Sequence, residues 1–139
     1  MTHSTTTRAL VELMLPAVPA SVREARVLAG AATLAVASDE QLADDVRLCV
    51  SEAVTNVVHH AYEATIGAVQ LVVTREGDEL VVVVRDDGTG VGPSRPRSGP
   101  GGLGLEIIDR LTSRCVITSA PNAGTTIRMS FALSGRSQA

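Results

Sequence analysis

The chain has 139 residues, of which 45% are hydrophobic and 1% aromatic, and its formal net charge is −3 at neutral pH. This length and apolar content exclude long-range disorder and favour one folded domain with a core of Val, Leu, Ile and Ala. All twelve basic residues are Arg and they form no basic stripe, so the composition argues against direct nucleic-acid binding.

No segment has the apolar length that a bilayer span requires, so we expect no membrane partner and a cytoplasmic protein. The start of the chain superficially resembles a secretory signal peptide, but Glu12 interrupts its apolar stretch and favours a strand. Cys49 and Cys115 lack metal-type spacing and are typical of reduced core cysteines. We expect a single domain over residues 8–134, with flexible tails at 1–7 and 135–139.

In chain order, the first predicted element is a strand over Ala9–Leu15, which Pro16 and Pro19 end. Ser21 and Glu24 have the spacing of a capping box, which predicts a helix that runs from Ser21 to about Ala37.

Ser38 and Gln41 form a second capping box, which opens a longer predicted helix over Asp39–Glu63. After Gly67 the apolar period changes to that of strands.

The second half of the chain predicts four strands and one short helix, separated by turns rich in Gly, Asp and Pro. The strands are Ala68–Arg75, Glu79–Arg85, Arg114–Ser119 and Thr125–Leu133, the helix is Leu105–Leu111, and a long loop covers Asp86–Gly104. Gly77 and Asp78 mark a hairpin turn between the first two of these strands. Because strands mostly follow one another directly, we predict an α+β, two-layer α/β sandwich with a mixed, mainly antiparallel sheet and helices on one face.

The long helix carries the first candidate site. Glu52, Asn56 and His60 are spaced by four residues and lie along the margin of its apolar stripe. A helix packed on a sheet by that stripe presents such a row at the rim of a cleft. The alternative is an ordinary polar helix edge that meets solvent.

A second candidate follows the strand that ends near Arg85. Asp86 is a carboxylate at a strand end, and Gly88 and Gly90 follow it with one residue between them. Glycine lets a ligand approach the backbone, and a carboxylate there can accept a hydrogen bond from the amino group of a base. A tight Asp-Gly turn without a ligand is the alternative.

Two further glycine motifs follow. Gly101, Gly102, Leu103 and Gly104 precede the short helix, where free N–H groups can bind phosphate. Gly124, Thr125 and Thr126 enter the last strand, and a Thr hydroxyl there can reach a base or a water beside Asp86. A plain linker and a strand-initiating Thr pair are the respective alternatives.

The order of these four motifs resembles the nucleotide-binding boxes of the GHKL, or histidine-kinase-like, ATPase superfamily. The segment from Val50 to Asn56, His60-Ala61-Tyr62-Glu63, and Gly124-Thr125-Thr126-Ile127-Arg128 are similar to the bacterial anti-sigma-factor serine-protein kinases. The resemblance covers roughly Ala9 to Leu133 and implies a histidine-kinase-like ATPase fold with ATP and Mg²⁺ as ligands.

The resemblance also implies roles for single residues. Glu52 is the expected base toward the attacking hydroxyl, and Asn56 is the expected Mg²⁺ ligand through its side-chain oxygen. Asp86 is expected to bind the adenine amino group, and the glycines to shape the pocket and a lid over the phosphates. The implied nucleotide-binding set is Asn56, His60, Asp86, Gly88, Gly90, Gly101, Gly102, Leu103, Gly104, Thr125 and Thr126.

The partners that the resemblance implies are a sigma factor, an antagonist protein that offers a serine, and a second copy of the chain. It predicts a homodimer that holds the sigma factor and phosphorylates the antagonist.

Three other functions are open to comparison. One is a binding module that uses ATP only as a structural ligand, which the short segment of ten residues between the glycine boxes, Val91–Pro100, favours. In that segment Pro100 replaces the usual first glycine, and Arg95 and Arg97 are displaced relative to the sporulation-type enzymes. A sensor histidine kinase needs a preceding helical hairpin with a phosphoacceptor His, and a gyrase-type clamp needs a transducer domain, so we expect neither.

Overall fold

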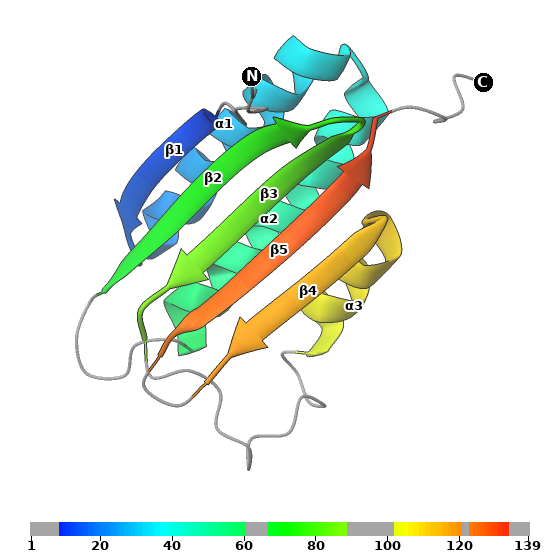
Figure 1. Cartoon of the computed structure of the whole chain (residues 1–139). Coiled ribbons are helices and arrows are strands. Elements are labelled where there is room, and N and C mark those ends of the chain that lie inside the picture. Colours follow the sequence, from blue (N-terminus) through cyan, green and yellow to red (C-terminus); the bar gives the residue numbers. More distant parts are fainter. Residues whose placement is uncertain (1–8, 61–66, 89–101, 121–122, 134–139) are drawn as a thin grey trace, which may run out of the picture.

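The computed structural model describes residues 9–60, 67–88, 102–120 and 123–133, so the predicted tails and the middle of the long loop lie outside the described residues. The elements, in chain order, are β1 (Ala9–Pro16), α1 (Pro19–Ala37), α2 (Glu40–His60), β2 (Ala68–Glu76), β3 (Glu79–Asp86), α3 (Gly102–Leu111), β4 (Arg114–Ser119) and β5 (Thr125–Ala132). Figure 1 shows the strands as one layer and the three helices together as a second layer behind it. The predicted two-layer α+β sandwich is confirmed.

The sheet has the strand order β1-β2-β3-β5-β4, and each of its pairings is antiparallel. The expectation of a mixed sheet was therefore wrong for the described strands. The connection through α3 carries the chain from β3 to β4, which run in the same direction, but β5 pairs between them. An inserted strand thus removes the parallel contact that the order along the chain suggested.

The hairpin between β2 and β3 has the predicted turn. Gly77 adopts a φ of 64°, a left-handed conformation that glycine reaches without a steric penalty. The register then pairs Glu76 with Glu79 and Val69 with Asp86 at the two ends of the ladder. This register decides which side chains of β3 face the helices.

The helix starts differ from the two predicted capping boxes. Helix α1 begins at Pro19, and its N-cap Val18 makes no side-chain cap hydrogen bond, so the box at Ser21 was wrong. Proline suits the first helical turn because its fixed φ is already helical and it needs no N–H partner there. Ser21 lies buried inside the helix instead, with 3% of its surface exposed.

Helix α2 is capped by Asp39 rather than Ser38. The Leu42 backbone N–H donates to Asp39 Oδ1 at 3.0 Å, whereas Ser38 takes a left-handed φ of 52° and ends α1. The predicted start of this helix, Asp39, was therefore one residue too early, because Ser38 and Asp39 are both polar residues that can cap a helix and Asp39 is the one that does so. Its predicted end, after His60, lies outside the described residues.

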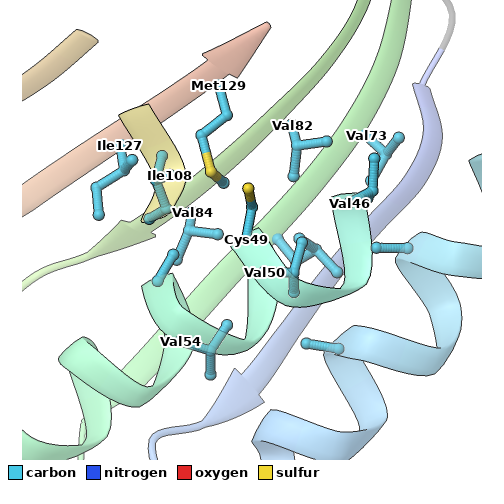
Figure 2. Close-up of a cluster of buried hydrophobic side chains, with 14 of the residues drawn as sticks. Val46, Cys49, Val50, Val54, Val73, Val82, Val84, Ile108, Ile127 and Met129 are labelled. Atoms are coloured by element: carbon cyan, nitrogen blue, oxygen red, sulfur yellow. The ribbon is translucent and has the colours of Figure 1, made fainter. Parts of the chain in front are cut away.

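The core lies between α2 and the sheet, and Figure 2 shows its centre. Val46, Cys49, Val50 and Val54 point from α2 toward the strands, whose buried side chains alternate with residues of the other sheet face. Ile108 of α3 closes the cluster on the side of β5 and β4. In the ranges that the structure describes, no helix combines the length and apolarity of a membrane span.

Candidate functional site

Four predicted motifs are carried by elements that end or begin at one edge of the sandwich. Figure 1 shows the end of β3, the start of β5, the end of α2 and the start of α3 at the lower end of the molecule. Helix α2 packs against both β3 and α3, so these elements form one connected body. Segments far apart in the sequence, such as the end of α2 and the start of β5, therefore lie at the same end of the fold.

Helix α2 contributes a polar row at the margin of its buried face. Ala53, Val54 and Val57 are buried in the core, whereas Glu52 and Asn56 are half-buried and lie one helical turn apart. His60 is the last residue of the helix, and its side chain is outside the described part of the structure. The row therefore offers a carboxylate and an amide oxygen on the same helix edge, as the four-residue spacing predicted.

Asp86 ends β3 as a buried carboxylate, with 5% of the residue exposed. Its Oδ1 accepts a hydrogen bond from the Gly88 backbone N–H at 2.8 Å, and the backbone of Thr125 also hydrogen-bonds the carboxylate. Burial raises the pKa of Asp86 above its ordinary 3.8, these two hydrogen bonds oppose the rise, and the nearby Asp87 adds to it. The side chain is thus a fixed acceptor in a region of low solvent access.

Gly124 belongs to the predicted Gly-Thr-Thr motif, but it was not in the implied nucleotide-binding set. Its φ is +75°, and a Cβ there would overlap the carbonyl oxygen of Asp86 and lie 2.9 Å from the Cα of Asp87. Only glycine allows the start of β5 to pack this closely on the end of β3. The sequence signal was the Gly-Thr-Thr motif itself, but the steric reason depends on the pairing of the two strands.

The two predicted threonines lie on opposite sheet faces. Thr125 pairs with Asp86 and shares the face of the buried Ile127, whereas Thr126 pairs with Arg85 and lies on the other face. The Thr125 hydroxyl hydrogen-bonds the Ser119 hydroxyl at 2.9 Å. The structure therefore brings Thr125 to Asp86 and does not bring Thr126 to it.

Helix α3 begins at Gly102, so Gly102, Leu103 and Gly104 form its first turn. The first backbone N–H groups of a helix have no partner within the helix, and together with the helix dipole they favour an anion. Ile108 anchors the helix in the core, which fixes the direction of that end. Gly90 and Gly101, predicted with this group, lie outside the described residues.

The residues present fit a magnesium ion that is held mainly by a bound nucleotide. Over the described ranges, no group of three or more His, Cys, Asp or Glu side chains is suited to hold a metal ion by itself. Mg²⁺ commonly takes one or two protein oxygens together with phosphate oxygens and water. The half-buried amide of Asn56, one turn from Glu52, supplies a hard oxygen of this kind.

Comparison with protein families identifies one domain over most of the chain. The family model described as "Histidine kinase-like ATPase domain" matches residues 15–131. Among curated proteins, the anti-sigma F factor of Bacillus velezensis is 33% identical over 101 residues, which cover 65% of this chain and 69% of that protein. The anti-sigma F factor of Clostridium kluyveri is 32% identical over 95 residues, which cover 61% of this chain and 67% of that protein.

Comparison with solved structures agrees on the fold. The histidine kinase domain of the blue-light activated histidine kinase from Erythrobacter litoralis EL346 superposes with a TM-score of 0.61 at 22% identity. The superposition covers 79% of this chain and 61% of that one. At this identity the likeness shows the architecture alone.

Proposed function

Because the chain belongs to the histidine kinase-like ATPase domain family, we propose that it is an ATP-binding anti-sigma factor that also acts as a protein serine kinase. The observation that carries the proposal is the position of Asp86. It is a buried acceptor held by backbone amides at the end of β3, the same end of the sandwich at which the polar row of α2 finishes. The names of the relatives support the anti-sigma role.

In this proposal Asp86 receives the exocyclic amino group of adenine. A carboxylate can accept more hydrogen bonds than the two that the backbone donates here, and an adenine amine supplies a further donor in the plane of the base. The Gly88 N–H and the Thr125 backbone hold the carboxylate, and Gly124 lets the start of β5 approach the Asp86 backbone. Guanine presents a carbonyl oxygen at that position, so the same carboxylate would discriminate against it.

The phosphates would lie between α2 and the start of α3. The amide N–H groups of the first turn, at Gly102, Leu103 and Gly104, would face them, and Asn56 would hold Mg²⁺ through its side-chain oxygen. A bound Mg²⁺ supplies charge neutralisation on the phosphate oxygens. His60, Gly90 and Gly101 complete the nucleotide-binding set that we propose.

Glu52 is the proposed base. As the serine oxygen of the substrate forms its bond to the γ-phosphorus, Glu52 accepts the hydroxyl proton and ADP leaves with the electrons of the broken phosphorus–oxygen bond. The carboxylate lies one turn before Asn56 on the same helix edge, so the base and the metal ligand would face the same phosphate. ATP binding without phosphoryl transfer does not require a carboxylate at position 52, so Glu52 favours the kinase over the binding module.

The partners that we propose are a sigma factor, an antagonist protein that offers the serine, and a second copy of the chain. The start of α1 is a candidate surface for the sigma factor and its antagonist. Arg23 and Glu24 are exposed there, and the exposed Val27 lies one turn further along. If the sigma factor binds at this surface, Arg23→Glu should weaken its binding and leave ATP affinity unchanged.

The test of the kinase function is a transfer assay with labelled ATP, Mg²⁺ and candidate antagonist proteins. Glu52→Gln should keep ATP affinity and lose transfer by about 10²–10⁴-fold. Glu40→Gln, an exposed change of the same kind in the first turn of the same helix, is the matched control and should retain transfer. Transfer at the wild-type rate in Glu52→Gln would refute the base, and absence of transfer in the wild type would leave the binding module as the function.

A further inference from the structure

One face of the sheet is covered by no described helix. Figure 1 shows it turned toward the viewer, with all three helices behind the strands. Leu10, Met14 and Val116 lie on it with 38%, 59% and 46% of their surface exposed, and they are three of the five exposed large hydrophobic residues in the described ranges. Leu10 and Met14 lie on β1, at one edge of the sheet, and Val116 lies on β4 at the opposite edge. Exposed large apolar side chains on an uncovered face indicate a contact surface, and the pair on β1 is the part that the arrangement below covers.

The middle of this face is a row of side chains that crosses the sheet. The ladders pair Glu12 with Val72, Val72 with Val83, and Val83 with Arg128. We call these four residues the central row. Val72 and Val83 are half-buried and do not belong to the hydrophobic core on the helix side. The row thus has a negative end, an apolar centre and a positive end.

We propose that a second copy of the chain covers this face, with a two-fold axis parallel to the strands that passes between β2 and β3. The proposal rests on the homodimer of the proposed function and assigns its surface. Rotation about this axis places β1 over the partner's β5 and β2 over the partner's β3. Glu12 then faces the partner's Arg128, and Val72 faces the partner's Val83, each contact occurring twice.

The charges of the central row select this axis over the other two-fold arrangements. An axis along the row would place Glu12 over the partner's Glu12 and Arg128 over the partner's Arg128, and both contacts are repulsive. An axis along β3 would place Val72 over the partner's Arg128 and Glu12 over the partner's Val116, which buries charges against apolar groups. Only the axis between β2 and β3 pairs opposite charges and joins apolar groups.

Sheets that pack face to face lie about 10 Å apart, a gap that small residues at the axis and long residues at the margins can fill. Of the two rows that flank the central row, the one with Gln70 and Arg85 fits the same axis. Gln70 pairs with Arg85 in the sheet, so each faces the other across the axis as a donor and an acceptor. In the other row Thr74 pairs with Val81, which is fully buried within its own chain, so only Thr74 would reach the partner there.

Arg128 can serve both its own chain and the partner. Its Nη2 donates to Glu76 Oε1 at 2.7 Å, and 41% of its side chain remains exposed. A guanidinium carries five N–H donors, so one ion pair leaves others for a second carboxylate. The bond to Glu76 also limits the rotamers of Arg128, which lowers the entropy lost when a partner binds.

Charge reversal tests the arrangement by sedimentation velocity and native mass spectrometry. Glu12→Arg and Arg128→Glu should each raise the dimer dissociation constant by at least about tenfold, because each replaces two attractive contacts by two repulsive ones. An equimolar mixture of the two variants should form heterodimers of near wild-type affinity, since both of its cross-contacts then pair opposite charges. The double variant should form homodimers again.

Arg114→Glu is the matched control. It reverses an exposed Arg on the same face and also breaks an ion pair with a strand Glu, Glu79, but β4 lies beyond the overlap of the two copies. It should leave the dissociation constant unchanged. Should Arg128→Glu fold poorly beside Glu76, Arg128→Gln added to Glu12→Arg should strengthen the dimer relative to Glu12→Arg alone.

Three results would overturn the assignment: a wild-type monomer at high micromolar concentration, single variants that dimerise as the wild type does, or a mixture that forms no heterodimer. The second result would leave the homodimer of the proposed function intact but move it to another surface. ATP binding measured on the same samples by calorimetry separates any of these failures from a failure of the nucleotide site.

Discussion

Replacement of Gly124 by Ala tests the packing that joins the two strands of the site. A Cβ at this position would overlap the Asp86 carbonyl oxygen and approach the Asp87 Cα to 2.9 Å, so backbone must move. The φ of +75° adds a second penalty, because side chains disfavour left-handed backbone. Gly77 has a similar φ of +64° with no atom within 4 Å of an added Cβ, and Gly77→Ala therefore isolates the conformational part.

The expected magnitudes differ between the two variants. Gly77→Ala should lower the free energy of unfolding by about 1 kcal/mol, the cost of left-handed backbone. Gly124→Ala carries the same cost plus about 1–3 kcal/mol for the backbone overlap, by analogy with overpacked cores. At roughly 4 °C per kcal/mol for a domain of this size, Gly124→Ala should melt about 4–12 °C below Gly77→Ala.

The assay has two readouts, thermal unfolding of the free protein and calorimetric titration with ATP. Displacement of Asp86 by the added methyl group should weaken ATP binding about tenfold in Gly124→Ala, whereas Gly77→Ala, at the opposite end of β3, should bind as the wild type does. If both variants have equal melting temperatures and equal ATP affinity, the close approach of β5 to β3 is not what holds the site.

Asp86→Asn should weaken ATP binding by roughly ten- to hundredfold, because a donor would face the adenine amine; calorimetry with unchanged affinity would remove Asp86 from the adenine site. Because burial raises its pKa, native Asp86 holds its proton more tightly than the unfolded chain, so its contribution to stability falls as pH rises from 3.8 through the native pKa. Asp86→Asn should abolish that component in unfolding curves measured across pH; an unchanged pH profile would contradict it. Burial, with the nearby Asp45, raises the pKa of Cys49 to about 12, so in Cys115→Ser its labelling by a thiol reagent at pH 8 should track unfolding, and labelling at the rate of a free thiol would show the site open.

The element order could be predicted because it depends on local signals. The two-residue turn at Gly77 and the alternating strands on either side of it together predict a β-hairpin. The start of α1 could not be placed in the same way. The pattern at Ser21 satisfies a capping box locally, but burial of Ser21 against the rest of the fold and Pro19 in the first turn decide the boundary. Tertiary packing here overrides a correct local signal.

The site residues also differ in whether a local pattern could predict them. The pair of Glu52 and Asn56 depends only on helical spacing, and the structure keeps both residues on one half-buried edge. The choice between Thr125 and Thr126 depends on the register of β5 against β3, which no local pattern specifies. Gly124 was likewise seen only as part of a motif, since its need for glycine arises from the carbonyl oxygen of Asp86 on another strand.

Because side chains alternate along β3 and β5, the two faces of the sheet would have different tasks, nucleotide binding on one and dimerisation on the other. Asp86 and Thr125 face the helices and would face the proposed nucleotide, whereas their neighbours Arg85 and Thr126 face the uncovered side. A shift of register by one residue would exchange the two sets, so the ladder that orients Asp86 also orients Arg128. Because each strand serves both faces through its backbone, a substitution that shortens or distorts β5 should impair nucleotide binding and dimerisation together. A charge reversal at Arg128, which leaves the ladder intact, should impair dimerisation alone.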